Sequence, residues 1–262
     1  MTALLLGLFA CAVSLLTLFS GFGLGTLLMP AFALFLPLDL AVACTAVVHF
    51  CNNLFKVGLL KGHVRRDVVM RFGLPAIGAS FVGAWVLVRL APSETLFEWT
   101  LGERTASVTA TGVVLGSLVL FFALFELIPK LRLLRAPPRF LSLGGALSGF
   151  FGGLSGHQGA LRAAFLGPLK LQPAEFAGTQ ALIALCVDAA RLLIYGWTFM
   201  LLNDSSDARS LPWDLVVVAT LSAFAGAYIG KRLLGKMTLD SLHQVVGWLL
   251  MVVGAGIALG LA

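Results

Sequence analysis

Five polar residues recur within one apolar stretch of the first half of the chain. Thr45, His49, Asn52, Asn53 and Lys56 follow one another at spacings of four, three, one and three residues. In a helix these spacings place them along a single stripe, which should face the protein interior. Such a stripe can bind a small polar or charged solute. For Lys56, near the expected end of the helix, snorkelling to the membrane surface is the favoured interpretation.

A similar polar set lies in the second half. Its members are Thr179, Gln180, Asp188 and Arg191. With a shift of about one residue, three of them align with members of the first stripe. Asp188 and Arg191 are three residues apart, so they can pair on one helix face. They are either a neutralised structural ion pair or groups that contact a substrate.

Two glycine-rich breaks interrupt the apolar segments. The first runs from Gly21 to Gly25 and includes Gly23, and the second runs from Gly152 to Gly159 and includes Gly156. Each break should open a short helix, whose unpaired N–H groups and positive dipole end favour an anion. The alternative is that the glycines only permit close helix crossing.

Three further polar residues accompany the second break. Arg162 falls in the first turn of its short helix, so it adds positive charge where the dipole is already positive. Arg162 is therefore the strongest candidate substrate ligand, with pairing to Asp188 as the alternative. Gln158 is a candidate ligand, and His157, like His49, either accepts a coupling proton or is a packed core histidine.

The tetrapeptide Gly153-Leu154-Ser155-Gly156 matches the Gly-x-Ser-Gly element of rhomboid-type intramembrane proteases. In such an enzyme the serine works with a histidine from another span, which here would be His49. The internal repeat described below has no place in a rhomboid. A non-enzymatic protein is therefore the expectation, and intramembrane hydrolysis is the weaker alternative.

Composition indicates that the lipid bilayer is the solvent of this chain. Of 262 residues, 59% are hydrophobic and only 11% are charged. Apolar runs long enough to cross a hydrocarbon core of roughly 30 Å separate short charged clusters. The net charge of +6 lies in a few loops, which argues against nucleic-acid binding. The four cysteines lie inside apolar runs without metal-ligand spacing, so no metal or cofactor is expected.

The segments predict an all-α polytopic transmembrane bundle of 8–10 membrane segments with discontinuous helices. Five pieces are expected at about 2–20, 26–36, 39–60, 69–90 and 105–128, and five more at about 139–151, 160–169, 173–196, 213–230 and 241–261. The same order in both halves predicts two transmembrane repeats, residues 1–128 and 139–262, joined by a cytoplasmic linker at 129–138.

Loop charges give the orientation of these repeats. The connections at 61–71 and 130–139 are basic and should be cytoplasmic, whereas the loop holding Glu94, Glu98 and Glu103 should face the other side. The connection after the third piece is basic in the first half and acidic in the second, at 203–214. The halves are therefore expected to be inverted relative to each other. A duplication with parallel halves is the alternative.

The chain resembles the TauE/SafE sulfite exporter family, also called the toluene sulfonate uptake permease family. The resemblance rests on the first break running to Pro30, on the stretch from Gly149 to Gly159 that contains the second break, and on Gly226 with Gly230. The segment Gly156-His157-Gln158-Gly159-Ala160-Leu161-Arg162 is similar to one bacterial branch. Leu24 replaces a glycine common in the first break, and His157 and Gln158 replace glycines in the second.

The resemblance implies a multi-pass transporter of the bacterial cytoplasmic membrane for sulfite, sulfonates or related small anions, with protons as the candidate coupling ion. The family includes both import and export, and the oligomeric state is open. The expected substrate site comprises Gly23, Gly25, Thr45, His49, Asn52, Asn53, Gly156, His157, Gln158, Gly159, Arg162, Thr179, Gln180, Asp188 and Arg191. A passive anion channel is the main alternative to a carrier.

Overall fold

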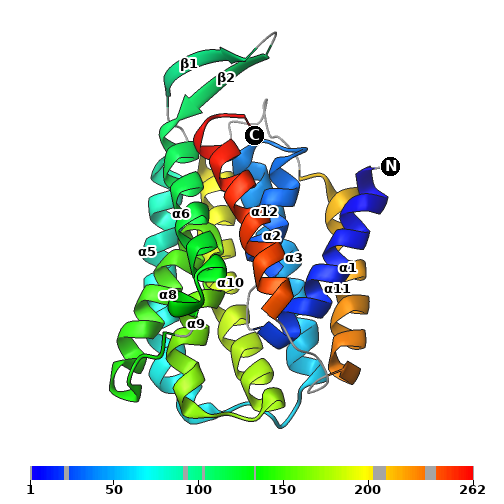
Figure 1. The fold of residues 1–262 in the computed structure, drawn as a ribbon, viewed down its shortest axis with the longest axis vertical. Coiled ribbons are helices and arrows are strands. Elements are labelled where there is room, and N and C mark those ends of the chain that lie inside the picture. The colour runs from blue at the N-terminus through cyan, green and yellow to red at the C-terminus, as the bar shows by residue number, and fades with distance from the viewer. Residues whose placement is uncertain are drawn as a thin grey trace.

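The protein is a helical bundle with one small β-hairpin at one end (Figure 1). The computed structural model describes residues 2–20, 24–90, 94–101, 104–132, 134–202, 211–233 and 240–261. Gly23, one of the expected site residues, lies outside these ranges, as do Glu103 and the acidic loop at 203–210.

The first half runs α1 (Thr2–Ser20), α2 (Leu24–Ala33), α3 (Leu38–Leu59), α4 (Arg66–Val68), a π-helical turn (Val69–Gly73), α5 (Leu74–Leu90), β1 (Thr95–Leu101), β2 (Arg104–Thr109) and α6 (Ala110–Leu127). The second half runs α7 (Pro129–Arg132), α8 (Leu141–Ser155), α9 (Gly159–Leu166), α10 (Pro173–Leu202), α11 (Trp213–Leu233) and α12 (Asp240–Ala258). Short 3-10 turns precede α8 (Pro138–Phe140) and follow α9 (Gly167–Leu169).

These bounds confirm an all-α membrane bundle, with two local differences. The second break is shorter than expected, because α8 continues through Ser155 and only Gly156 to Gln158 lie between α8 and α9. The expected acidic loop after α5 is instead an antiparallel hairpin, β1 paired with β2. The indole Nε1 of Trp99 ties this hairpin to the carbonyl oxygen of Leu259, at 2.9 Å.

Glycines explain why α8 stays helical across its glycine-rich end. A side chain at Gly145, Gly149 or Gly153 would overlap the backbone of α5 at Phe72, Ala76 and Ser80 in turn. The two helices therefore touch backbone to backbone, as small residues allow in membranes. The glycine run serves helix contact up to Gly153, and only Gly156 breaks the helix.

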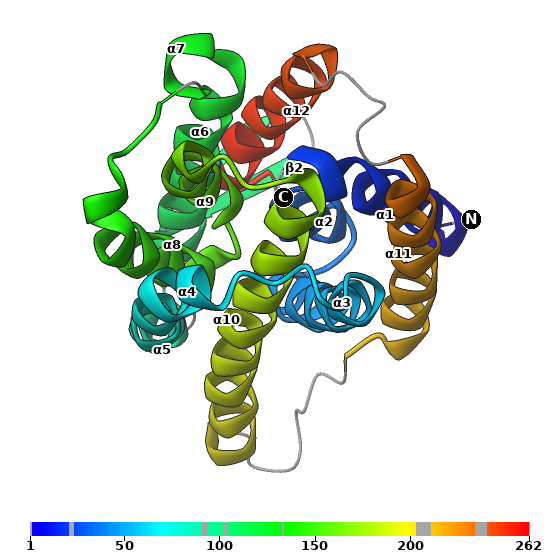
Figure 2. The same cartoon turned by 90° about the horizontal axis from the view of Figure 1, so that it is seen from below.

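Two pairs of helices join the first half of the chain to the second in equivalent ways. α5 packs along α8, and α1 packs along α11, where Gly226 lies against Cys11 and Gly230 against Leu15. In both pairs residue numbers rise together along the contact, so the paired helices run parallel. The fourth segment of each half thus packs on the first segment of the other (Figure 2).

Segments that hold the same position in the order of the two halves run antiparallel to each other. α6 packs along α12 with Gly112 beside Ile257 and Gly247 beside Leu127, so their directions oppose. The third segments, α3 and α10, also pack together, and they too run in opposite directions (Figure 1).

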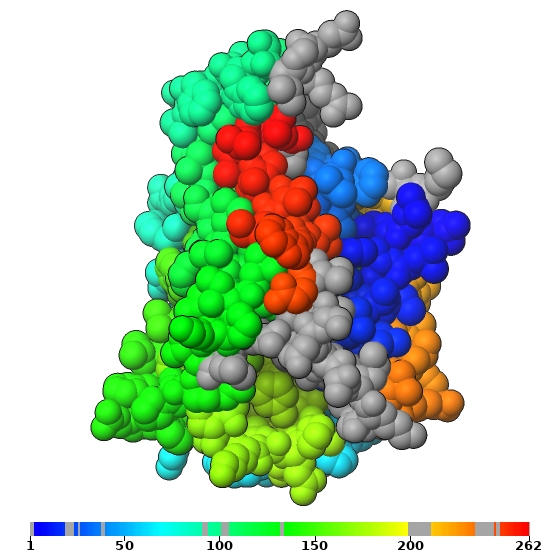
Figure 3. Space-filling view, in the orientation of Figure 1, coloured from blue at the N-terminus to red at the C-terminus, as the bar shows by residue number. Residues whose placement is uncertain are grey.

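Within the part of the chain that the structure describes, five helices are long and apolar enough to cross a membrane: Leu40–Leu59, Arg66–Leu90, Ala110–Leu127, Pro173–Thr198 and Trp213–Leu233. Shorter apolar helices occupy Ala3–Leu18 and Gly247–Ala258. Large apolar side chains such as Leu8, Leu193 and Val252 are exposed, which fits a lipid-facing surface. Figure 3 shows the outer face of the bundle to which α1, α6 and α12 contribute. The chain is a multi-pass membrane protein.

The basic connections and the hairpin lie at opposite ends of the bundle. The connection from α3 to α4 and helix α7 lie at the bottom of Figure 1, and the hairpin lies at the top. Lys231, near the end of α11, donates to the carbonyl oxygen of Leu59 at 2.8 Å, so a third basic segment joins the bottom end. Basic connections therefore gather at one end of the bundle, as expected for loops that face the cytoplasm.

Candidate functional site

The start of α2, which follows the first glycine-rich segment, lies against the break between α8 and α9 inside the bundle. A Cβ placed on Gly25, in the first turn of α2, would lie 3.4 Å from the carbonyl oxygen of Gly156 and 3.8 Å from the His49 ring. The beginning of α2 therefore lies against the junction of α8 and α9. Gly25, Gly156 and His49, taken from three separated parts of the sequence, are neighbours as the sequence predicted.

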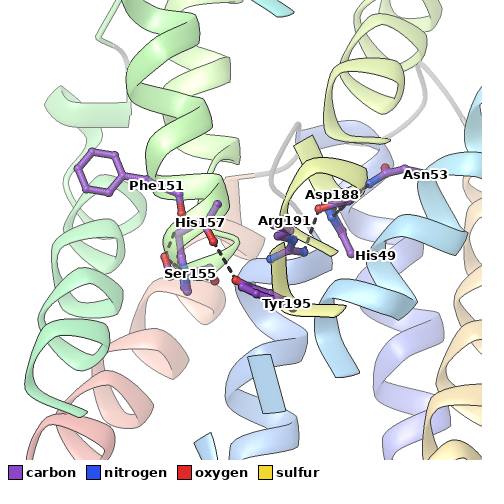
Figure 4. A network of polar contacts seen from close by, with 9 residues as sticks. His49, Asn53, Phe151, Ser155, His157, Asp188, Arg191 and Tyr195 are labelled. Carbon is purple, nitrogen blue, oxygen red and sulfur yellow. Dashed lines mark hydrogen bonds and ion pairs between the residues drawn. The ribbon is translucent and has the colours of Figure 1, made fainter. Parts of the chain in front are cut away.

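Asp188 is the centre of a buried polar network (Figure 4). Its Oδ2 accepts from His49 Nδ1 at 2.7 Å and from Asn53 Nδ2 at 3.1 Å, which joins α10 to α3. Its Oδ1 lies 2.9 Å from Arg191 NH2. A carboxylate buried in this way is stabilised by its donors and by the neighbouring guanidinium. Asp188 and Arg191 thus form the ion pair that their spacing predicted.

Arg191 in turn packs on the second break. A Cβ at Gly156 would lie 2.9 Å from Arg191 NH1, and Gly156 has a φ of +81°. Glycine is required there twice, for the left-handed backbone and for the space that the guanidinium occupies. One turn further along α10, Tyr195 donates to the carbonyl oxygen of Gly153 at 2.8 Å. The long helix α10 therefore holds both α3 and the α8–α9 junction.

A pocket with an empty volume of about 340 Å³, its open mouth included, lies beside this network. Its lining comprises Thr17, Leu18, Leu24, His49, Asn53, Lys56, Arg162, Ala177, Gln180, Ala181 and Ala184. These residues come from the end of α1, the start of α2, the last turns of α3, the middle of α9 and the start of α10. The pocket is therefore displaced toward the basic end of the bundle.

Two cationic side chains line the pocket. Arg162 is only 2% exposed, and its NH1 donates to the carbonyl oxygen of Gln180 at 2.9 Å. Lys56 is also buried, which contradicts the expectation that it snorkels to the surface. Among the described lining residues there is no carboxylate. The electrostatic environment of the pocket is thus positive and suits an anion.

Lys56 stays inside because polar groups meet its ammonium. With the Asn52 amide oriented to satisfy its surroundings, its oxygen accepts from Lys56 Nζ at 3.1 Å and its nitrogen donates to the carbonyl oxygen of Ala223 at 3.2 Å. In the same orientation Ser14 Oγ, on α1, lies 3.2 Å from both the nitrogen and the oxygen of the Asn52 amide. The amide fixes the position of the cation without neutralising its charge. One signal in the sequence pointed to this role, the place of Lys56 on the polar stripe.

A family model, Sulfite exporter TauE/SafE, matches residues 5–257. The chain belongs to this family. No curated protein matches it. Members of the TauE/SafE family are membrane transporters and not enzymes, which confirms the resemblance and the expectation of a non-enzymatic protein.

Ser155 has a structural role in this TauE/SafE protein. Its hydroxyl donates to the carbonyl oxygen of Phe151 at 3.2 Å, as serine does in helices. His49, the partner that a hydrolase would need, is bonded to Asp188 instead. His157 Nδ1 lies 3.1 Å from Ser155 Oγ, but the imidazole is stacked on Phe122 within an aromatic cluster. The Gly-x-Ser-Gly element is therefore part of helix α8 and its cap.

Several expected ligands lie outside the pocket lining. Thr179 Oγ1 accepts from the backbone N–H of Arg65 at 2.9 Å, so it anchors the loop before α4. Thr45 is buried one turn above His49. The backbone carbonyl of Gln158 accepts from Ser148, and its side chain lies against Gly152, where α8 and α9 meet. Asn52 contacts the lining residue Lys56, and Arg191 pairs with Asp188, which bonds the lining residues His49 and Asn53.

Among the described residues, no group of three or more His, Cys, Asp or Glu side chains could hold a metal ion. The pocket lining includes the nitrogen-bearing side chains of His49, Asn53, Lys56, Arg162 and Gln180 and the hydroxyl of Thr17. His49 and Asn53 in turn bond the carboxylate of Asp188, which does not line the pocket. Such a lining can bind and release an anion.

Proposed function

We propose that the protein is a secondary carrier that moves a small sulfur-containing anion across a bacterial cytoplasmic membrane. The observation that carries the proposal is a pocket beside the junction of α8 and α9 whose described lining holds two cations and no carboxylate. Donors that are already in place lower the free-energy cost of dehydrating an oxyanion. The family description names sulfite, and we extend the proposed substrate class to sulfonates and related oxyanions.

Alternating access is the transport mechanism that the arrangement of the two halves supports. Segments of equal rank run antiparallel, and the first segment of each half packs on the fourth of the other, which is the arrangement expected of inverted repeats. Residues 1–128 and 139–262 would be the repeats and 129–138 their linker. Rocking of one half against the other would then expose the same pocket to each side in turn.

Packed side chains close the pocket on the side of the hairpin, and this closure favours a carrier over a passive channel. Above His49 on α3 lie the buried residues Thr45 and Val48, and above Asp188 on α10 lie Arg191 and Tyr195. Apolar residues of α2, among them Leu28, fill the space beside them. An anion that enters the pocket from the basic end is therefore blocked by packed side chains from reaching the hairpin end. A carrier with alternating access must have such a closure on one side.

His49 is the proposed acceptor of a coupling proton. It lines the pocket and bonds Asp188, and it is also within electrostatic range of Arg162 and Arg191. Occupation of the pocket by an anion would therefore favour protonation of the imidazole, which links the movements of anion and proton. His157 does not line the pocket, so it is the weaker of the two histidine candidates.

Counterflow in proteoliposomes tests the proposal. Vesicles loaded with unlabelled sulfite should take up external labelled sulfite transiently above equilibrium, because a carrier exchanges across one site and a channel does not. Arg162→Ala should abolish this exchange, since the variant loses a guanidinium of the pocket while the protein still inserts. Arg139→Ala, which removes an exposed arginine at the same end of the bundle, is the control and should exchange normally. Exchange by Arg162→Ala at the wild-type rate would refute the site.

A further inference from the structure

Charged groups in the core around the pocket do not balance. The buried charged residues are Lys56, Arg162, Arg191, Asp188 and Glu126. Glu126 is remote from the pocket lining, since its Cβ lies beside Gly247 in the contact between α6 and α12. The other four surround or back the pocket. They comprise three cations and one carboxylate, so two positive charges there have no counter-charge among the described residues.

The one carboxylate is already engaged. Asp188 binds His49 and Asn53 from α3 and forms its ion pair with Arg191 on its own helix. The lining cations Lys56 and Arg162 therefore face the pocket with only neutral partners, an amide oxygen for Lys56 and a backbone carbonyl for Arg162. Both side chains line the same pocket, so their positive charges share one space. Buried charge of one sign is unfavourable unless a counter-charge arrives.

We infer that the pocket selects doubly charged oxyanions over singly charged ones, and that Lys56 is the residue that sets this preference. The inference rests on the proposed function and deepens it by naming the charge of the substrate. Arg162 provides one positive charge, which any anion can use. Lys56 adds the second, which only a dianion neutralises fully. Sulfite in its dianionic form and thiosulfate belong to the preferred class, and alkylsulfonates do not.

Two anions of similar shape and different charge test this inference. Sulfate and methanesulfonate share a tetrahedral sulfur and differ by one oxygen, replaced by a methyl group, and neither changes protonation near neutral pH. Their affinities for the purified full-length protein are to be measured by isothermal titration calorimetry at one pH and constant ionic strength. The wild-type protein should bind sulfate about ten-fold or more tightly than methanesulfonate, because it can make a second charge-assisted contact.

Lys56→Met should remove this preference. Its affinity for sulfate should fall about ten-fold or more, and its affinity for methanesulfonate should stay within about three-fold, since one charge contact is lost only for the dianion. Lys56→Arg should keep the preference, because it keeps the charge. Lys61→Met removes an exposed lysine five residues further along the chain and should bind both anions like the wild type.

Four results would overturn the inference. The inference is overturned if the wild type binds both anions equally, if it binds neither, or if Lys56→Met retains the preference. It is equally overturned if Lys56→Arg loses the preference as Lys56→Met does, because charge would not then be the cause. Counterflow of labelled sulfite by the wild type would persist in each of these cases if the carrier proposal holds. Loss of counterflow is what would count against the carrier itself.

Discussion

Asp188→Asn should destabilise the protein far more than the same substitution at a surface ion pair. The side chain keeps its shape and loses its charge, so Arg191 keeps a buried guanidinium without a carboxylate. His49 and Asn53 lose the charged acceptor that joins α3 to α10. Removing one partner of a buried pair typically costs about 3–5 kcal/mol. We expect a loss in that range, measured by unfolding in mixed micelles of increasing denaturing-detergent content.

Asp67→Asn is the matched control. Asp67 pairs with Arg65 at 2.9 Å, the same separation as in the pair of Asp188 with Arg191, but both side chains are exposed. Solvent screens such pairs, so the control should unfold like the wild type. The double variant Asp188→Asn/Arg191→Met should regain part of the stability, because no uncompensated charge remains. The reasoning fails if Asp188→Asn costs no more than Asp67→Asn, or if the double variant is no more stable than the single one.

Three further predictions concern packing and orientation. Gly149→Ala should cost about 1–3 kcal/mol, because its methyl group overlaps the backbone of α5, whereas Gly78→Ala, where the space is open, should be neutral in the same unfolding assay. Tyr195→Phe should cost about 1 kcal/mol for its lost hydrogen bond, and an unchanged midpoint would show that α10 does not depend on that contact. A cysteine at Lys61 should react with a membrane-impermeant maleimide only in inverted vesicles, and one at Glu98 only in intact cells; the reverse labelling would invert the topology.

The sequence was sufficient for the fold class and most helix positions because both follow from local physics. An apolar run in a chain this poor in charge must satisfy its backbone within a helix, so the expected piece at 39–60 appears as α3 at Leu38–Leu59. Residues 95–109 were expected to be a loop and the start of a span. They form a hairpin instead, since strand pairing depends on a partner segment and on the anchor that Trp99 finds on Leu259.

Within the candidate site, the sequence determined which residue types face the interior, because a polar stripe on a membrane helix must be buried. It placed Asp188 three residues from Arg191, and their ion pair follows from helical periodicity alone. Only the tertiary structure decided that Asp188 bonds His49 across 139 positions of sequence. The tertiary structure also decided that Lys56 points inward. Asn52 bonds the Lys56 ammonium and contacts Ser14, and this contact exists only when α1 and α3 pack together. Contacts between distant segments depend on helix packing, which no periodicity within one segment encodes.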